Sequence, residues 1–265
     1  MKDNIISTVT TVFNDPRVVD TIDSLCHQSL SPDEVFVANA GLSSGTLDSL
    51  HSISDMFPFV RVVDVPGNVS MSRNLTLPLI DAKGSDDIIV IVDSDEVAPE
   101  NYIRDLTKPI RDGWADFTGG YYKPLHPARN SVERYLHKKC DHLTHKVLFS
   151  PRHIPMGCSA WRRRVFDDVG GFDTSFSSGG EDFDVNLRAL NNGFRGMVLP
   201  DVFLFHDLRF DSWFQFMKKR YGYHKGSLMA YNKNNFSPVM FHPYTVIDYF
   251  LKFLAYVTTR GDGGR

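Results

Sequence analysis

The chain has 265 residues, of which 42% are hydrophobic and 23% are charged, as is ordinary for a globular protein. This length suits one sizeable α/β domain, or one such domain with a C-terminal appendage. The formal net charge of -3 gives no reason to expect a nucleic acid partner. No apolar run reaches the ~18 residues that a membrane-spanning helix needs, so the sequence predicts no such helix.

The cysteines and the N-terminus indicate where the protein resides. Cys26, Cys140 and Cys158 are scattered and odd in number, which argues against a disulfide framework and is typical of a reducing compartment. Met1-Lys2-Asp3 leads directly into a predicted strand, without the pattern of a secretory signal. We therefore expect a cytoplasmic protein, either free in the cytoplasm or at the cytoplasmic face of a membrane.

The N-terminal part alternates apolar segments with segments of helical periodicity. Strands are predicted at residues 5–13, 34–38, 60–65 and 88–92. Helices are predicted from residue 18, over residues 47–56, and from Ser70 or Ser72 to about residue 82 with a kink at Pro78. This alternation indicates βαβ units and a parallel sheet. No Gly-x-Gly-x-x-Gly follows the first strand, so an ordinary dinucleotide site is not expected.

The second half of the chain is predicted to be more irregular. Helices are expected over residues 100–111, 132–147 and 162–168, and from residue 181 to an Asn-Asn-Gly stop at 191–193. Strands are expected over residues 114–122, 154–161, 194–199 and 202–205. His142 and His145 would share a helix face, but no cysteine or glutamate stands at a supporting spacing, so a zinc pair is not favoured.

Asp93-Ser94-Asp95 follows the apolar run 88–92, which is typical of a strand buried on both faces. Such a strand ends at the carboxyl edge of the sheet, where α/β folds bind ligands. Two carboxylates one residue apart at that edge can hold a hard divalent cation such as Mg2+ together with substrate phosphates. For an isolated acid-x-acid triplet the alternative is a solvated turn.

A second acidic motif, Gly-Gly-Glu-Asp-Phe-Asp, occupies residues 179–184. Two glycines let the backbone approach a ligand closely, although acids at a helix start are also favoured by the helix dipole alone. His206 follows the last apolar segment, where a half-buried structural histidine is the alternative. The presence of these groups in one chain with Asp93 and Asp95 favours a shared functional site.

Together these motifs resemble those of the family 2 glycosyltransferases of the GT-A fold, over residues 5–225. The resemblance rests on segments that follow the family order: Phe13-Asn14, residues 33–37, Ser72-Arg73-Asn74, Asp93-Ser94-Asp95, Gly170-Gly171-Phe172-Asp173 and residues 179–184. It implies an α/β GT-A fold, with a single Rossmann-like, mostly parallel sheet flanked by helices and a C-terminal helical appendage. Residues 1–210 would form the nucleotide-sugar-binding and catalytic domain. Residues 211–265 would form a helical segment on the acceptor side or at a membrane surface.

The resemblance also implies a metal-dependent, inverting hexosyltransferase that moves a sugar from a nucleotide-sugar donor to an acceptor hydroxyl. Asp95 would bind Mn2+ or Mg2+ directly, Asp93 would contact the metal or the ribose, and His206 would complete the metal site. Asp182 would act as general base, and Glu181 would orient the acceptor or sugar hydroxyls. The residues expected to line the nucleotide-sugar site are Thr11, Phe13, Asn39, Arg73, Asp93 and Ser94.

One segment departs from the family pattern. The family usually has an acid after the second strand that reads the base, whereas this chain has Asn39-Ala40-Gly41. Asparagine both donates and accepts hydrogen bonds, unlike a carboxylate, so UDP-linked and GDP-linked donors both remain open. A non-catalytic nucleotide- or carbohydrate-binding relative also remains open. A nucleotidyltransferase is less favoured, because residues 14–17 do not form a glycine- and lysine-bearing phosphate loop.

The expected acceptor is a glycan or a lipid-linked molecule. Aromatic residues adjoin Lys218-Lys219-Arg220, in a segment similar to one that lies near the acceptor in family members. Residues 244–257 form an aromatic-rich, helix-like run that either docks on the core or lies on a membrane as an amphipathic helix. The second arrangement would give the C-terminal segment a peripheral membrane contact.

Overall fold

The structure is a computed structural model that describes residues 4–140, 147–176 and 179–235. The described strands are β1 (Ile6–Val12), β2 (Glu34–Asn39), β3 (Val60–Asp64), β4 (Ile88–Ile91), β5 (Glu96–Val97), β6 (Phe117–Pro124), β7 (Leu148–Phe149), β8 (Ser159–Arg162) and β9 (Gly196–His206). The described helices are α1 (Val18–Cys26), α2 (Ser44–Met56), α3 (Val69–Thr76), α4 (Tyr102–Arg111), α5 (Ser131–Cys140), α6 (Arg163–Val169), α7 (Glu181–Asn191) and α8 (Trp213–Lys233), with a 3-10 turn, η1 (Met156–Cys158).

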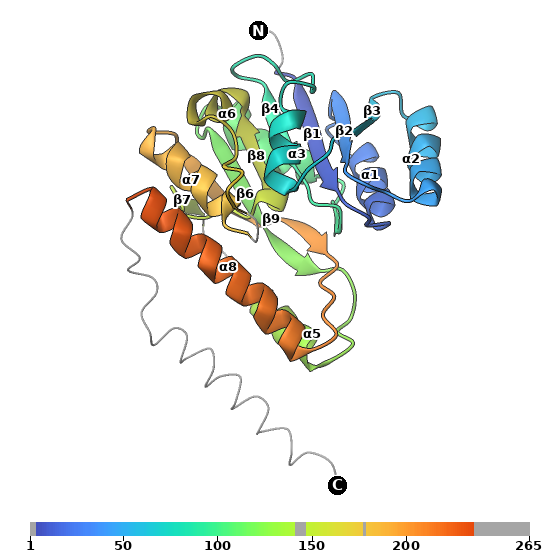
Figure 1. Ribbon diagram of the computed structural model, residues 1–265. Helices are drawn as coiled ribbons and strands as arrows, with labels where there is room; N and C mark the ends of the chain where they lie inside the picture. The colour runs from blue at the N-terminus through green and yellow to red at the C-terminus, as the bar shows by residue number, and fades with distance from the viewer. Residues whose placement is uncertain (1–3, 141–146, 177–178, 236–265) are drawn as a thin grey trace.

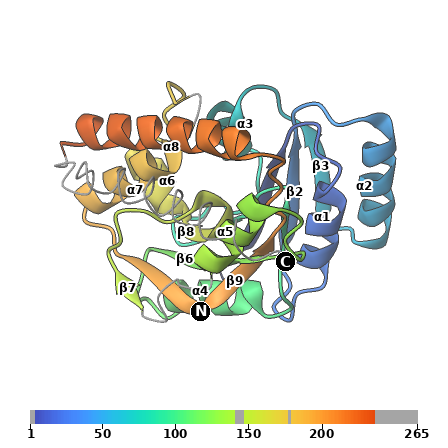
Figure 2. The same ribbon diagram turned by 90° about the horizontal axis from the view of Figure 1, so that it is seen from below.

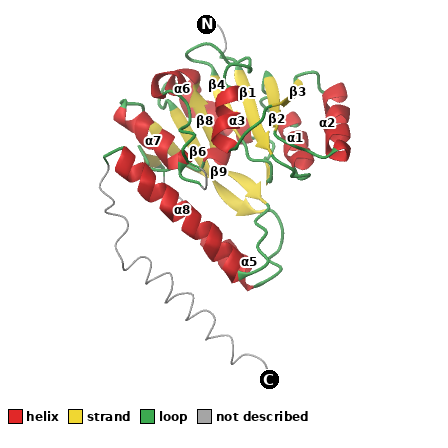
Figure 3. Cartoon of the chain, in the orientation of Figure 1, coloured by secondary structure: helices red, strands yellow, loops and turns green. Residues whose placement is uncertain are grey.

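These strands form one sheet in the order β3-β2-β1-β4-β8-β6-β9-β5, with β7 paired to β9. Helices cover both faces of the sheet, which gives three layers (Figures 1 and 2). Figure 3 shows the same arrangement by secondary structure, with the helices outside the strands. The predicted α/β fold is confirmed.

The β4 strand shows why its sequence is apolar without interruption. Ile88 and Val90 belong to a buried cluster with residues of α1, α2 and α4. Ile89 and Ile91 belong to a second cluster, which includes residues of α6 and α7 on the other face. Because side chains alternate between the two faces of a strand and both faces are covered, every position of β4 is buried.

The first four strands pair in parallel, so their carboxyl ends meet at one edge. β1 lies between β2 and β4, with Val9 opposite Ile91 on one side and Thr11 opposite Ala38 on the other. This register brings the end of β1, the loop after β2 and Asp93-Ser94-Asp95 to the same edge of the sheet. The edge is the place where α/β folds bind ligands.

The second half of the sheet is partly antiparallel and ends in a long strand. β8 runs antiparallel to β4 and β6, and β9 runs parallel to β6. Residues 194–199 and 202–205 were predicted as separate strands, and this division was wrong because β9 runs unbroken through Pro200. A register shift between Gly119 and Tyr121 of β6 faces that part of β9, where proline has no N–H to offer a neighbour.

Several predicted boundaries also differ from the structure. Asn68, and not Ser70 or Ser72, caps α3, since its side-chain oxygen accepts from the Met71 N–H at 3.0 Å. α3 ends at Thr76, before Pro78, so the predicted extension to residue 82 was wrong. Residues 154–161 were predicted as one strand, but they include the 3-10 turn η1, and only β8 is extended.

Two predictions fall outside the described residues. α5 ends at Cys140, and residues 141–146, which include His142 and His145, are not described. The predicted helix at 244–257 is likewise outside the described ranges. Among the helices that are described, none has both the length and the apolar character needed to cross a bilayer.

α8 packs against the start of α7 through glycines. A Cβ atom added to Gly226 would overlap the Gly179 carbonyl and would lie 3.0 Å from the Gly180 Cα. The two helices therefore approach each other directly beside Glu181. The division of the chain at residue 210 stays a prediction.

We predict that Gly226→Ala destabilises the protein, because the added methyl must push α8 away from Gly179 and Gly180. Overpacking of this kind costs about 1–3 kcal/mol, which chemical unfolding would measure. Gly45→Ala in α2 is the matched control, because no heavy atom lies within 4 Å of a Cβ added there. Equal stabilities of the two variants would contradict the glycine contact.

Candidate functional site

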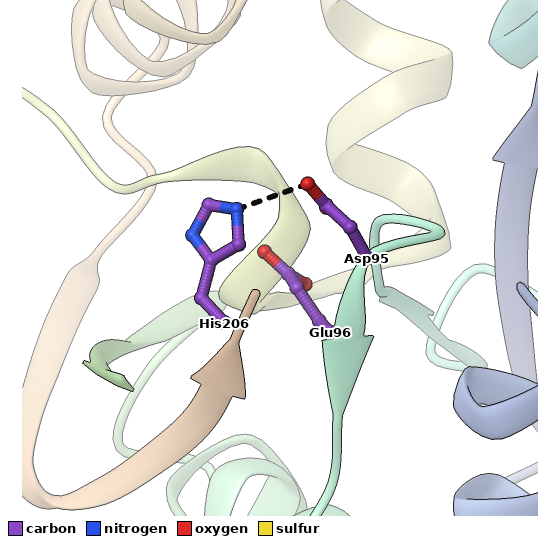
Figure 4. A group of neighbouring side chains, drawn as sticks. All are labelled: Asp95, Glu96 and His206. Carbon is purple, nitrogen blue, oxygen red and sulfur yellow. Dashed lines mark hydrogen bonds and ion pairs between the residues drawn. The ribbon is translucent and has the colours of Figure 1, made fainter. Parts of the chain in front are cut away.

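Asp95, Glu96 and His206 converge at the carboxyl edge of the sheet (Figure 4). Asp95 and Glu96 come from the turn after β4 and from β5, and His206 ends β9. Glu96 and His206 are direct partners in the antiparallel β5–β9 ladder, which brings the two segments together. One potential ligand atom from each of the three side chains lies within 4.8 Å of the other two, and His206 Nε2 is 3.2 Å from Asp95 Oδ2.

The chemistry of these three side chains fits a divalent cation. Glu96 is completely buried, and its Oε1 has no hydrogen-bond partner among the described residues. Burial raises the pKa of Glu96 well above its ordinary value, and the neighbouring Asp93 and Asp95 raise it further. The raised pKa disfavours the charged form of this buried carboxyl group. A cation bound beside its unpaired oxygen and the two other ligand groups would stabilise the charged form.

The sequence prediction named Asp93, Asp95 and His206 as metal ligands and missed Glu96. The signal for Glu96 was its position directly after Asp93-Ser94-Asp95. In the structure Asp93 Oδ1 accepts from Arg73 at 2.8 Å, and Asp93 is not one of the three clustered groups. Its Oδ2 nevertheless faces the cluster, because a Cβ added to Gly157 would lie 2.6 Å from Asp93 Oδ2 and 2.8 Å from Glu96 Oε1.

Arg73 joins the two acidic motifs. Its guanidinium donates to Asp93 Oδ1 at 2.8 Å and lies 3.4 Å from Glu181 Oε1. Arg73 is only 4% exposed, and its guanidinium lies over the Phe172 ring at 5.5 Å. The structure thus brings together residues from α3, from the turn after β4 and from the start of α7.

The segment that carries Arg73 is fixed to the Gly170-Gly171-Phe172-Asp173 turn. The Asn74 side chain donates to the Phe172 carbonyl and accepts from the Phe172 N–H, both at 2.7 Å. Gly171 has a φ of 73°, and a Cβ there would lie 2.6 Å from Asn74 Oδ1. Two motifs that are distant in sequence are therefore one packing unit that positions Arg73.

Asp182 is held by two hydrogen bonds. Its Oδ1 accepts from the Phe183 N–H at 2.8 Å, and its Oδ2 lies 2.7 Å from His153 Nε2. The His153 ring stacks on Phe183 with the centroids 3.9 Å apart and the planes 10° from parallel. Sequence reasoning missed His153, because a single histidine in an irregular segment has no pattern that marks it.

The two adjacent acids of α7 differ in their electrostatics. Burial favours a raised pKa for Asp182, but the charge and the hydrogen bond of His153 outweigh burial, so the pKa of Asp182 is lowered. For Glu181, burial dominates over the nearby Arg73, so its pKa is raised. Asp182 is therefore ionised at neutral pH and can accept a proton.

Asp95 adjoins an open pocket of about 340 Å3. Burial favours a raised pKa for Asp95, but His206, Arg17 and Lys219 lower it. Arg17 NH2 lies 3.5 Å from Asp95 Oδ2. The pocket is lined by Asp15, Pro16, Arg17, Asp95, His206, Asp207, Leu208, Arg209, Phe210 and Lys219.

The residues predicted to line the nucleotide-sugar site differ in their exposure and in their hydrogen bonds. Phe13 is 74% exposed beyond the end of β1, and Thr11 is the last residue but one of that strand. Asn39 is buried, accepts from the Gly41 and Leu42 N–H groups, and donates to Asp64 Oδ1 at 2.7 Å. Ser94 lies between the two acids, and its carbonyl accepts from the Thr21 hydroxyl.

The chain matches the model of one protein family, which is described as "Glycosyltransferase like family 2", over residues 4–234. No curated protein matches the sequence.

Several solved structures share the fold. The mannosyltransferase PcManGT from Pyrobaculum calidifontis, in complex with GDP-Man and Mn2+, has a TM-score of 0.67 and 16% identity, over 98% of this chain and 76% of that chain. S. aureus TarS has a TM-score of 0.59 and 16% identity, over 77% of this chain. GalNAc-T7 with UDP, GalNAc and Mn2+ has a TM-score of 0.61 and 16% identity, over 78% of this chain and 44% of that chain. This chain spans 37% of the TarS chain.

We predict that His153→Ala lowers the free energy of unfolding, and that the size of this loss depends on pH. A carboxylate whose pKa is lowered by folding stabilises the protein above its unfolded-state pKa, and the stabilisation is lost as the pH falls through the folded-state pKa. Without His153, burial moves the pKa of Asp182 upward from its lowered value. Each pKa unit of this rise removes about 1.4 kcal/mol of stability at higher pH.

Urea unfolding from pH ~5.5 down to pH ~3 would measure this effect, because unfolded histidine is already protonated throughout this range. The stability difference between His153→Ala and the unchanged protein should narrow as the pH falls. His27→Ala is the control, since His27 lies 3.6 Å from Asp23 in an exposed pair. A difference that stays constant with pH would mean that His153 acts only by packing on Phe183.

Proposed function

The chain belongs to the family described as glycosyltransferase like family 2, and from this premise we propose that it transfers a sugar from a nucleotide-sugar donor to an acceptor hydroxyl. The transfer would use Mn2+ or Mg2+ and would invert the anomeric carbon of a hexose. One observation carries this proposal: Arg73 contacts both Asp93 and Glu181. The Asp93-Ser94-Asp95 segment and the adjacent acids at the start of α7 therefore belong to one site.

Asp95, Glu96 and His206 are the residues that we propose to hold the cation. Carboxylate oxygens are suitable ligands for Mg2+ and Mn2+. The cation would offset the negative charge that the nucleoside diphosphate gains as it leaves. Asp93, held by Arg73, would contact the ribose or complete the metal site from its second oxygen.

Asp182 is the proposed general base. The acceptor O–H bond breaks, its proton passes to the Asp182 carboxylate, and the oxygen forms a bond to the anomeric carbon from the face opposite the diphosphate. The bond from that carbon to the diphosphate breaks, and its electron pair leaves with the phosphate oxygen. The hydrogen bonds from His153 and Phe183 orient Asp182, while each carboxylate oxygen has a further lone pair for the acceptor. Glu181 would orient hydroxyl groups of the acceptor or the sugar.

The donor is proposed to be UDP- or GDP-linked. Structures with the same fold hold both kinds of ligand: TarS 1-349 is in complex with UDP-GlcNAc, and PcManGT with GDP-Man. Phe13 is exposed at the sheet edge and can stack on a base. Asn39 already uses its side-chain oxygen and nitrogen within the fold, so it supports neither base over the other.

The acceptor and the location stay predictions. A glycan or lipid-linked acceptor, a cytoplasmic site of action and a peripheral membrane contact of the C-terminal segment are consistent with the family assignment. One observation favours a non-catalytic nucleotide- or carbohydrate-binding relative. The Asn39 side chain stands where the family usually has an acid that reads the base, and it is already hydrogen-bonded within the fold.

We predict that Asp182→Asn strongly slows transfer and leaves nucleotide binding intact, because the amide cannot take the acceptor proton. A general base contributes about 10²–10⁴-fold, so release of nucleoside diphosphate from the donor should fall by that factor. Calorimetric binding of the nucleoside diphosphate should stay within about twofold, a change of under ~0.5 kcal/mol. Asp201→Asn, an exposed carboxylate on β9, is the matched control.

Turnover of Asp182→Asn close to that of the unchanged protein would exclude this base. Nucleotide binding by the unchanged protein with no turnover of any nucleotide sugar, including hydrolysis, would instead support the non-catalytic relative.

We predict that nucleotide binding depends on Mn2+ or Mg2+ and on Glu96. Calorimetric titration of UDP, GDP, CDP and dTDP, with and without each metal, should show tight binding of one nucleotide in the presence of metal only. Asp95→Ala and Glu96→Gln should each weaken this binding by about tenfold or more, which corresponds to ~1.4 kcal/mol.

Asp93→Asn tests whether Glu96 or Asp93 is the third metal ligand beside Asp95 and His206. If Glu96 is the ligand, Asp93→Asn should weaken metal-dependent binding less than Glu96→Gln does. The reverse order would assign the metal contact to Asp93, and equal binding with and without metal would contradict a metal-dependent site altogether.

A further inference from the structure

One side of α8 presents large apolar side chains to solvent. Phe214 is 79% exposed, Tyr221 73%, Met217 53% and Leu228 39%. Lys218 and Lys225 are also exposed. These residues recur at spacings of three, four and seven along the helix, so they share one face, which extends for roughly 21 Å at 1.5 Å per residue. The outer stripe of α8 is defined by Phe214, Met217, Lys218, Tyr221, Lys225 and Leu228.

The opposite side of α8 faces the protein. Phe216, Gly226, Ala230 and Tyr231 are buried there, and Tyr231 belongs to a cluster with Leu187 of α7. The apolar residues of the outer stripe are therefore not core residues of the described part of the chain. α8 lies at the periphery of the described part of the chain in both views (Figures 1 and 2). The exposed fractions of Phe214 and Tyr221 place the outer stripe in contact with solvent.

The charge of this segment is opposite to that of the whole chain. Residues 212–247 contain no aspartate or glutamate, but they contain five lysines and arginines. The chain as a whole has a formal net charge of -3. A helix with exposed aromatic and aliphatic side chains, interspersed lysines and no acid is complementary to an anionic lipid surface.

We propose that the outer stripe of α8 binds the surface of an anionic lipid bilayer. Phe214, Met217, Tyr221 and Leu228 would enter the headgroup region, and Lys218 and Lys225 would pair with lipid phosphates. A second copy of the chain fits this surface less well, because it would place two segments of like charge against each other. The proposal deepens the peripheral membrane contact expected of the C-terminal segment by naming the residues that would make it, and its argument is the exposure and charge of α8 and not the transfer reaction.

The position of α8 gives this contact a consequence for the site. A Cβ added to Gly179 would lie 2.6 Å from the Tyr223 ring of α8, and Lys219 of α8 lines the pocket beside Asp95. The side of the helix that faces the protein thus borders the candidate site, while the outer stripe points away from the protein. This consequence rests on the proposed function: binding through the stripe would hold the site near the bilayer, which would bring a lipid-linked acceptor within its reach.

Co-sedimentation of the full chain with vesicles tests the proposal. The unchanged protein should bind vesicles that contain 30% phosphatidylglycerol, bind phosphatidylcholine vesicles weakly, and be released by salt, because salt screens the lysine contacts. Phe214→Ala/Tyr221→Ala and Lys218→Glu/Lys225→Glu should each reduce binding to the anionic vesicles by about tenfold or more.

Two matched controls change the same residue types elsewhere. Phe149→Ala removes a side chain of β7 that is 74% exposed, and Lys83→Glu reverses an exposed charge before β4. Both should bind vesicles as the unchanged protein does. Thermal unfolding of each variant checks its fold, and unchanged nucleotide titrations would separate loss of lipid binding from damage to the site.

Three results would overturn the proposal. The unchanged protein could fail to bind anionic vesicles, or the stripe variants could bind as tightly as the controls. Analytical ultracentrifugation could also show a dimer that the stripe variants abolish, which would assign the surface to a second copy of the chain.

Discussion

The candidate site depends on the buried, positively charged guanidinium of Arg73. Asp93 and Glu181 belong to acidic motifs that the fold brings to the same edge of the sheet, where carboxylates would repel each other and lose hydration. The Arg73 guanidinium contacts both of them and is almost fully buried. Its planar fork can serve two carboxylates at once, which a lysine ammonium on a flexible chain does less well. The assembly of the site therefore requires that α3 be placed correctly.

The placement of α3 explains why two distant motifs occur together. Asn74 forms paired hydrogen bonds with Phe172, and Gly171 has no side chain that would block them. Arg73 follows from this contact, since it is the neighbour of Asn74 and lies over the Phe172 ring. Gly170 and Gly171 therefore affect the site indirectly: they allow the contact between Asn74 and Phe172, and this contact positions Arg73 beside the acids.

Much of the fold and part of the site could be predicted because their signals are local. The apolar run of β4 indicates a strand covered on both faces, and such a strand ends where Asp93 and Asp95 stand. The glycines before Glu181 mark the start of α7. Glu96 was missed because β5 has two residues, too few for any periodic pattern. The contact of His153 with Asp182 and the hydrogen bond from Asn39 to Asp64 join segments that are distant in sequence. No local sequence pattern indicates which of these segments meet in the fold.

The β5–β9 ladder carries a consequence for how the protein loses its structure. β5 is a two-residue strand at the edge of the sheet, and short edge ladders open before the core does. Glu96 and His206 face each other in this ladder, so fraying of the sheet edge and dismantling of the proposed cation site are the same event. A ligand that bridges the two side chains would slow amide hydrogen exchange at this edge, since binding stabilises only the closed state. The order of this two-residue edge strand would thus report occupancy of the site.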